Sequence, residues 1–238
     1  MRELTPIARI RSDFPSKFGI PRQSGLIDVL KAAIVFEPPF RDASALRGLE
    51  GYSHIWLIWQ FSESVMEGWS PTVKPPRLGG NRRMGVFATR SPFRPNPLGL
   101  SCVRLERIEL ATPDGPVLHV AGADLMDGTP IYDIKPYLPH ADCHPEATGG
   151  FSGEVMDYAV AVDFPEALLS LLPGDKREAI LEVLRQDPRP GYRHGDGERR
   201  YGVEFAGFDV RFTVNDGILR VCEVVPIEKN ELSDETKP

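Results

Sequence analysis

A cluster of positive charge is the first feature of this chain that could do chemistry. Seven basic side chains and no acidic one lie between Gly68 and Leu105. The other 200 residues carry 21 basic and 34 acidic groups, so the total charge of −6 conceals a strong segregation. The basic segment could bind the phosphates of a nucleic acid, while the acidic remainder limits non-specific attachment. Arginines that only hydrate a loop rich in proline and glycine would give the same pattern.

The part of this segment around Arg94 is predicted to be stiff. Three closely spaced prolines in Ser-Pro-Phe-Arg-Pro-Asn-Pro each fix their own φ and keep the preceding residue extended. Arg90, Arg94 and Asn96 are then held at little entropic cost, and an arginine can bind a carboxylate or phosphate through forked hydrogen bonds. Neither a P-loop nor a Rossmann glycine motif accompanies the loop, so the usual nucleotide-binding folds are not expected.

Two further segments carry polar groups next to turns. The turn Pro21-Arg22-Gln23 offers a cation and an amide, and Asp127-Gly128 starts a second turn. In the alternating stretch that follows, Asp133 and Lys135 face the same side. They could form a polar pair at a pocket or an ordinary pair of surface charges, and the residues alone favour the surface pair.

The elements that must position these residues are predicted to be strands. Short apolar runs, rich in β-branched and aromatic residues and separated by Gly, Pro, Asn and Asp, fill roughly the first 125 residues. Many short strands with almost no helix between them are typical of a closed or nearly closed β-barrel. One short helix is expected after Asp42, which is placed to cap it. The runs interpreted as strands are 7–10, 27–36, 54–61, 86–89, 102–110 and 117–121.

The composition changes after Asp142, through a stretch that suits a linker. We therefore expect a barrel domain over residues 1–142, a small α+β domain over 143–230 and a frayed tail over 231–238. The second domain is predicted to contain helices at 165–172 and 175–185 and strands at 201–205, 208–214 and 219–225. Its basic and aromatic side chains around residue 190 could form a second RNA contact, and a solvated loop is an equal alternative.

Length and composition exclude several classes of protein. With 41% hydrophobic and 26% charged residues among 238, the chain has enough apolar material for a buried core and lies outside the disordered range. Its three cysteines form no Cys-x-x-Cys pair, so neither a disulfide framework nor a metal site is expected. The N-terminus lacks the apolar stretch of a signal peptide, and the longest apolar run is too short for a bilayer. We expect a cytoplasmic protein without a membrane partner.

Five motifs of this chain occur in the order found in the TrmO, or TsaA-like, family. They are Pro21-Arg-Gln, Gly48-Leu-Glu-Gly-Tyr-Ser-His-Ile-Trp, Pro75-Pro-Arg-Leu-Gly-Gly, Gly85-Val-Phe-Ala-Thr-Arg-Ser-Pro-Phe-Arg-Pro-Asn-Pro-Leu-Gly and Asp127-Gly-Thr-Pro with the following Asp-Ile-Lys-Pro-Tyr. The segment Gln186-Asp-Pro-Arg-Pro-Gly-Tyr-Arg also resembles the C-terminal domain of bacterial members. The resemblance implies a single β-barrel methyltransferase outside the Rossmann scheme that binds S-adenosylmethionine and acts as a homodimer. It also implies methylation of N6 of a threonylcarbamoyladenosine next to the anticodon of threonine tRNA.

The same resemblance indicates where a cofactor would bind. The family's cofactor contacts fall here on Pro21, Arg22, Gln23, Ser62, Glu63, Arg90, Leu100, Asp127, Gly128, Thr129 and Pro130. Family members have His-Gln where this chain has Ser62-Glu63, so an anion replaces an amide there.

Catalytic and tRNA-binding residues are assigned as hypotheses. We expect Arg90, Asp133 and Lys135 to be catalytic. Asp133 or Asp127 could take the proton of the acceptor nitrogen, with His119, in a strand, and His140, in a loop, as alternatives. The residues expected to contact tRNA are Arg82, Arg83, Arg94, Asn96, Arg189, Tyr192 and Arg193.

Two other functions are compatible with the same residues. The chain could be an RNA-binding β-barrel without catalysis, because many barrels bind RNA and a fold does not dictate a function. It could also be a sensor that binds S-adenosylmethionine and modifies nothing. Binding of S-adenosylmethionine and the analysis of methylated nucleosides would distinguish these alternatives from a methyltransferase.

Overall fold

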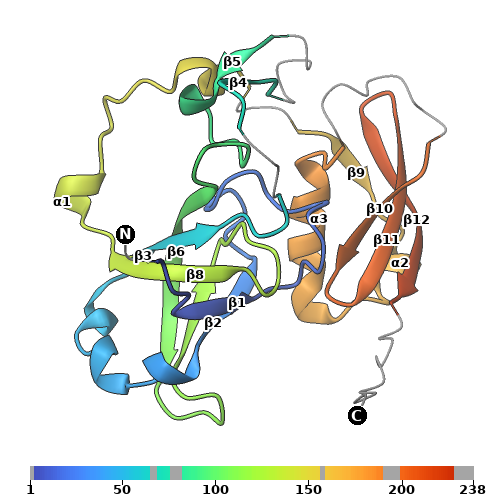
Figure 1. Ribbon diagram of the computed structural model, residues 1–238. Helices are drawn as coiled ribbons and strands as arrows, with labels where there is room; N and C mark the ends of the chain where they lie inside the picture. The colour runs from blue at the N-terminus through green and yellow to red at the C-terminus, as the bar shows by residue number, and fades with distance from the viewer. Residues whose placement is uncertain (1–2, 65–68, 76–81, 156–158, 190–198, 228–238) are drawn as a thin grey trace, which may run out of the picture.

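The structure is a computed structural model that describes residues 3–64, 69–75, 82–155, 159–189 and 199–227. It consists of a β-barrel, a smaller α+β unit beside it and a two-stranded sheet that stands away from the barrel wall (Figure 1). The predicted architecture, mainly β with a barrel followed by a small α+β unit, is confirmed. None of the helices in the described ranges has the length and hydrophobicity needed to cross a membrane.

Six strands close the barrel in the order β1-β2-β7-β6-β3-β8, and β8 pairs with β1. All neighbouring strands are antiparallel. Alternate residues of β3, namely Ile55, Leu57 and Trp59, are buried in the interior, as a strand with one wet face requires. The strands are β1 (Ala8–Arg11), β2 (Lys31–Phe36), β3 (His54–Gln60), β6 (Leu98–Glu109), β7 (Val117–Ala121) and β8 (Pro130–Pro136).

This strand order brings three long connections to one end of the barrel. Because neighbouring strands alternate in direction, the β1–β2, β3–β6 and β7–β8 connections must leave from the same end. They comprise residues 12–30, 61–97 and 122–129. The middle connection contains the two-stranded sheet of β4 (Thr72–Val73) and β5 (Met84–Gly85), followed by the 3-10 turn η5 (Val86–Ala88).

Short 3-10 helices occupy the β2–β3 connection at the other end: η1 (Pro38–Phe40), η2 (Ala43–Leu46) and η3 (Leu49–Gly51). Asp42 caps η2 as predicted, because its carboxylate accepts a 2.9 Å hydrogen bond from the Ser44 amide. The single helix expected here is instead divided, since Gly48 has a left-handed φ of 89° between η2 and η3. Two strand predictions are also wrong in extent: 86–89 forms a 3-10 turn, and 27–30 precedes β2.

The second unit is a four-stranded sheet in the order β10-β11-β12-β9, with α3 packed on it. Ile180 and Leu184 of α3 are fully buried. The helix predicted at 175–185 is α-helical only from Arg177, where it begins without a side-chain cap. The predicted tail 231–238 lies outside the described residues. The elements after β8 are α1 (Pro139–Asp142), η6 (Gly150–Val155), β9 (Ala161–Asp163), α2 (Glu166–Leu169), η7 (Gly174–Lys176), α3 (Arg177–Arg185), β10 (Tyr201–Phe205), β11 (Phe208–Asn215) and β12 (Ile218–Pro226).

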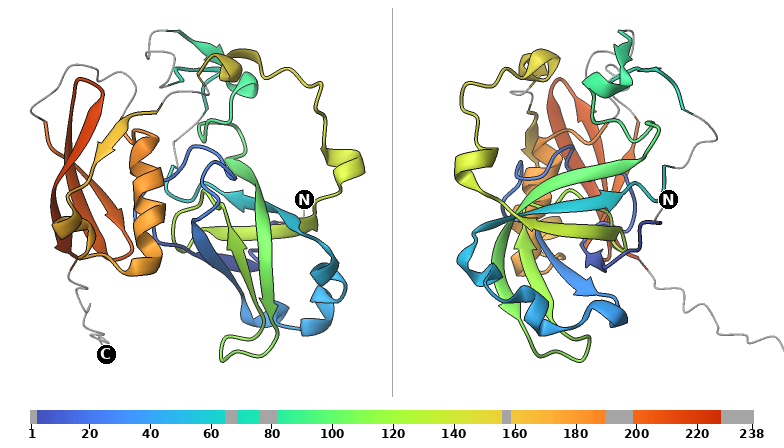
Figure 2. Two further views of the ribbon diagram at one scale, coloured as in Figure 1. Left: turned by 180° about the vertical axis from the view of Figure 1, so that it is seen from behind. Right: turned by 60° about the vertical axis from the view of Figure 1, so that its left-hand side comes forward.

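The β1–β2 connection is shared between the two units. Phe14, Ile27 and Leu30 belong to the hydrophobic core of the second unit, although they precede it by more than 100 residues. The Phe14 ring lies 5.2 Å from that of Phe205, centre to centre. Helix α3 accordingly stands between the four-stranded sheet and the barrel (Figure 2). One loop at the barrel end is thus fixed by the second unit.

Candidate active site

The three connections at the barrel end contact one another through polar groups. Arg90 donates a hydrogen bond to the side-chain oxygen of Gln23, and Lys17 donates one of 2.5 Å to the backbone carbonyl of Glu63. Gly25 donates its amide to Gly122 at 2.9 Å. The β1–β2 connection therefore contacts the other two, and it brings the predicted cofactor residues Gln23 and Arg90 into direct contact.

A chain of buried hydrogen bonds lies under these loops. The Trp59 indole donates to the Ser101 hydroxyl at 2.9 Å, and that hydroxyl donates to the Asp124 carboxylate at 2.5 Å. Burial raises the pKa of the Asp124 carboxyl, although the Ser101 hydrogen bond and the positive charge of Arg90 oppose this rise. The Trp59 ring fits here because residue 99 is glycine, where a Cβ would come within 2.2 Å of the ring.

Asp124 is a site residue that the sequence reasoning missed. It is the third residue of the β7–β8 connection, at the barrel end that carries Arg90. A carboxylate just after a buried strand, three residues before the Asp127-Gly128 turn, was the available signal. This position in the sequence does not by itself indicate a site, because the sequence does not show which loops meet at the barrel end.

The Asp127–Pro130 turn is fixed to the start of the chain. The Asp127 carboxylate accepts a 2.9 Å hydrogen bond from the Ser12 amide, and the Gly128 amide donates to Ile10 at 2.8 Å. Gly128 has a φ of 76°, which favours glycine. Thr129 and Pro130 are buried, whereas Asp127 and Gly128 are exposed. Asp127 thus presents a carboxylate to solvent at the same end as Arg90.

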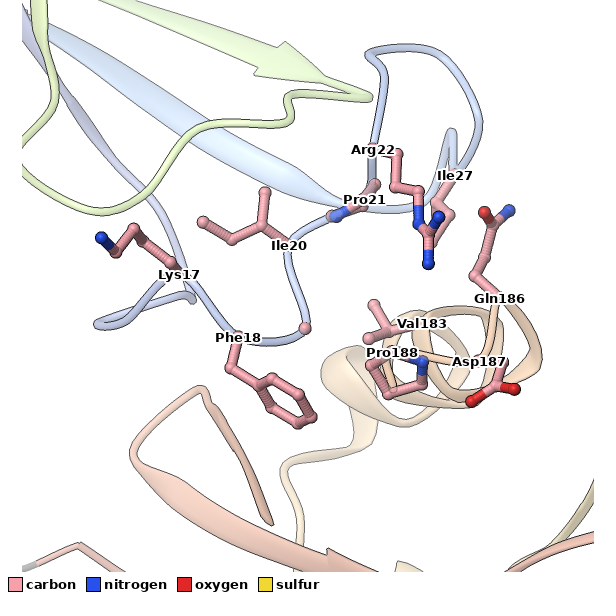
Figure 3. A pocket seen from close by; sticks show the side chains of 11 residues that line it. Lys17, Phe18, Ile20, Pro21, Arg22, Ile27, Val183, Gln186, Asp187 and Pro188 are labelled. Atoms are coloured by element: carbon pink, nitrogen blue, oxygen red, sulfur yellow. The ribbon is translucent and has the colours of Figure 1, made fainter. Parts of the chain in front are cut away.

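Pro21 and Arg22 lie where the β1–β2 connection meets the second unit. They line a cleft with Val183, Gln186 and Asp187 at the C-terminal end of α3, and Arg22 extends toward that end (Figure 3). Ser62 directly follows the Phe61 that β3 leads into, and its amide donates to Gln60 at 2.9 Å.

Leu100 of β6 is 53% exposed, on the opposite face of its strand from Ser101. The predicted cofactor residues therefore lie at the same end of the barrel, but their side chains do not all point to the same side.

The predicted catalytic pair Asp133 and Lys135 is not brought to Arg90. The two side chains form an ion pair of 2.9 Å on the outer wall of the barrel, where 46% and 61% of their surfaces are exposed. Asp133 pairs in register with Ile58 and Lys135 with Trp56, so β8 carries them from the site end toward the other end.

Of the two histidines considered, His119 lies in β7 and contacts Glu109 at 3.0 Å. His140 lies in α1 rather than in a loop.

The predicted tRNA contacts divide into three groups. Arg82, Arg83 and Asn96 are exposed on the β3–β6 connection, and Arg94 is partly buried, donating to the Thr89 carbonyl at 3.3 Å. Arg189 is only 7% exposed because its guanidinium forms two 2.8 Å hydrogen bonds with the Asp187 carboxylate. That burial removes Arg189 from any exposed basic surface. Tyr192 and Arg193 lie outside the described residues.

The fold and site together define a class of protein. It is a closed antiparallel barrel whose polar site is built from three loops at one end, without the parallel sheet of a Rossmann fold. Within the described ranges, no group of three or more His, Cys, Asp and Glu side chains could hold a metal ion.

Comparison with known families identifies this class. Residues 9–143 match the tRNA-methyltransferase O N-terminal domain, and residues 158–227 match the TrmO C-terminal domain. The chain therefore belongs to the tRNA-methyltransferase O family, a family of methyltransferases, and the resemblance inferred from its motifs is confirmed.

Individual relatives are similar over about three quarters or more of the chain. The tRNA (adenine(37)-N6)-methyltransferase of Escherichia coli K12 is 44% identical over 227 residues, which cover 92% of this chain and 96% of that protein. The enzyme of the same name from Eikenella corrodens is 46% identical, over 74% of this chain and 99% of its own length. A crystal structure of TrmO from Pseudomonas aeruginosa superposes with a TM-score of 0.74 at 35% identity, covering 94% of this chain and 99% of that one.

Proposed function

We propose that this chain methylates N6 of the adenine at position 37 of a tRNA, with S-adenosylmethionine as the methyl donor. The observation that carries the proposal is the 44% identity to a tRNA (adenine(37)-N6)-methyltransferase over 92% of the chain. A relative from Pseudomonas aeruginosa, 40% identical over 93% of the chain, is described as a putative S-adenosylmethionine-dependent methyltransferase.

The residues at the barrel end fit such a cofactor. The Arg90 guanidinium and the Gln23 amide can donate to the carboxylate of the cofactor, and the turn with the exposed Asp127 lies at the same barrel end. Ser62 and Glu63 contribute through their backbone, because Lys17 holds the Glu63 carbonyl and thereby fixes that turn. Bound there, S-adenosylmethionine supplies a methyl group on a positively charged sulfur.

The chain's own residues then have two tasks. The first is alignment: the contact between Arg90 and Gln23 closes two loops over the site, and in-line displacement depends mainly on such positioning. The second is removal of the proton from the acceptor nitrogen as its lone pair attacks the methyl carbon. Asp127 is the base we favour because it shares the barrel end with Arg90. Asp133, paired with Lys135 on the outer wall, is the alternative.

Finer features of the substrate follow from the same residues. Arg90 and Arg94, held on one proline-rich loop, suit the carboxylate of a threonylcarbamoyl group, which supports threonine tRNA as the substrate.

A homodimer is supported by residues 139–150, an arm that leaves the barrel and is exposed along its whole length. We propose that a second copy covers this arm, and that the enzyme works in the cytoplasm, where its three free cysteines would stay reduced.

One assay separates these functions. Purified protein is incubated with S-adenosylmethionine and threonylcarbamoylated tRNA, and the nucleosides are analysed by mass spectrometry. A methyl group on N6 of the modified adenosine is the expected product. Binding of the cofactor in a calorimeter without any methylated nucleoside would indicate a sensor, and binding of tRNA without either would indicate a non-catalytic RNA-binding barrel.

A further inference from the structure

Two large aromatic rings lie exposed on the β3–β6 connection. Trp69 is 53% exposed and Phe87 is 74% exposed. Their ring centres are 6.2 Å apart and their planes differ by 28°, so the rings are stacked on each other. Aromatic side chains are normally a major part of buried cores, and clustered apolar groups on a surface mark an interaction site.

The backbone holds these rings in place. Trp69 precedes β4 and Phe87 follows β5, and the pairing of Thr72 with Gly85 brings both rings to the same end of the small sheet. The Val86 amide donates to Pro71 at 2.9 Å, and the Val86 side chain is only 1% exposed. Val86 therefore anchors the turn whose next residue, Phe87, points away from the protein.

The small sheet that carries the rings also carries exposed cations. Arg82 and Arg83 directly precede β5 and are exposed, and Arg83 donates to the Thr72 hydroxyl at 2.9 Å, which keeps its guanidinium beside the small sheet. No acidic residue occurs from Gly68 to Leu105. Exposed rings on a small sheet that also carries exposed arginines suit a polyanion that offers flat apolar faces, and unpaired nucleotides have both properties.

We propose that Trp69 and Phe87 form a stacking platform for an unpaired base of the tRNA anticodon loop. This inference rests on the proposed function, because it takes tRNA as the substrate. Phe87 is three residues from Arg90, so their Cα atoms are at most about 11 Å apart. Since both side chains extend from one short segment, the platform holds a base close in the loop to the one at Arg90. It fixes the loop while the target base enters the site.

The test measures RNA affinity directly. A fluorescently labelled anticodon stem-loop is titrated with the full chain and with Trp69→Ala, Phe87→Ala and the double variant. We expect the dissociation constant to rise roughly 5- to 100-fold on loss of a stacked base, with affinity for S-adenosylmethionine unchanged in a calorimeter. The slope of log affinity against log salt should stay the same, whereas Arg82→Ala with Arg83→Ala should reduce it. Phe87→Tyr and Trp69→Tyr, which keep a ring, should restore binding.

A second readout reports the stacking itself. An anticodon loop that carries 2-aminopurine next to the target adenosine should lose fluorescence on binding the unmodified chain and regain it with the double variant. Leu110→Ala is the matched control, because Leu110 is an exposed apolar residue, 57% accessible, on the β6–β7 connection.

Each contrary outcome overturns the proposal. Unchanged RNA affinity in the double variant, together with normal methylation by the unmodified chain, would overturn the platform and leave the proposed function intact. Absence of both RNA binding and methylation in the unmodified chain would overturn both. If the double variant instead halved the mass in sedimentation without weakening RNA binding per subunit, the rings would belong to an interface between two copies.

Discussion

The hydroxyl of Ser101 donates a 2.5 Å hydrogen bond to the carboxylate of Asp124, beneath the loop that carries Arg90. Burial raises the pKa of this carboxyl above its ordinary value. An acid whose pKa is higher in the folded protein stabilises the fold most at low pH, and this contribution is lost as the pH rises through the folded pKa. Stability at neutral pH is therefore reduced by the need to ionise Asp124.

Asp124→Asn should remove this pH dependence. We expect the thermal midpoint of the variant, relative to the unmodified chain, to be higher at about pH 7 than at about pH 4. Asp114→Asn, which removes an exposed carboxylate that pairs with Arg11, controls for the change of net charge. At the same time kcat/KM should fall, because Arg90 loses a neighbouring negative charge. An Asp124→Asn variant that lost stability on going from acid to neutral pH would contradict this account.

Arg90→Lys should lose most methylation while the protein stays folded. Arg90 is exposed, so the stability of the fold should depend little on it. The site depends on it because its planar guanidinium offers several N–H donors and its contact with Gln23 joins two loops. Loss of a hydrogen bond to a charged group corresponds to roughly a 10- to 100-fold drop in kcat/KM. The measurement is steady-state methylation with thermal midpoints alongside. Arg47→Lys, at an exposed position between β2 and β3, is the control and should have no effect. Near-normal activity of Arg90→Lys would contradict the assignment of Arg90 to the site.

Two carboxylates compete for the role of base. Asp127→Asn keeps the Ser12 hydrogen bond, since an amide oxygen can accept it, yet it removes the proton acceptor at the barrel end. We expect kcat to fall strongly. Asp133→Asn breaks only an exposed ion pair, which is worth about 0–1 kcal/mol, so its kcat should match that of the unmodified chain. The reverse pattern would assign the proton transfer to Asp133.

The buried pair of Arg189 and Asp187 gives a different kind of prediction. Replacing Arg189 with Met would leave the Asp187 carboxylate without the two hydrogen bonds it now accepts. Removing one partner of a buried ion pair costs about 3–5 kcal/mol, so the midpoint of denaturant unfolding should fall clearly. The salt dependence of tRNA binding should be unchanged, because this guanidinium is buried. A reduced salt slope in a variant of normal stability would return Arg189 to the tRNA surface.

The barrel could be predicted from the sequence, but the meeting of its loops could not. Short strands separated by turns are a local pattern, so runs such as 54–61 and 117–121 indicated β3 and β7 directly. The neighbours of each strand depend on pairings between distant residues, for example β7 lying between β2 and β6. For that reason Asp124 was missed, and the position of Asp133 on the outer wall could not be predicted.

The burial of Arg189 could not be predicted either, because burial also depends on packing that the local sequence does not show. Arg189 looked like a surface arginine because its neighbours in sequence are polar or turn-forming, while its partner Asp187 has a left-handed φ of 47° that no local pattern indicates. The loop predicted around Arg94 is confirmed, since prolines act locally and no helix or strand forms at 90–97. The strand expected at 86–89 forms a 3-10 turn because Val86 is fixed by the small sheet rather than by a barrel neighbour.

Gly99 gives the most direct test of the packing beneath the site. A Cβ at this position would lie 2.2 Å from the Trp59 ring, so Gly99→Ala must move either β6 or the indole that donates to Ser101. Overpacking of this kind costs about 1–3 kcal/mol, or roughly 2–4 °C of thermal midpoint per kcal/mol for a chain of this size. Tryptophan fluorescence should shift as the indole loses its place. Gly51→Ala, where a Cβ meets nothing within 4 Å, should leave both signals unchanged. Equal behaviour of the two variants would show that Trp59 is not confined by Gly99.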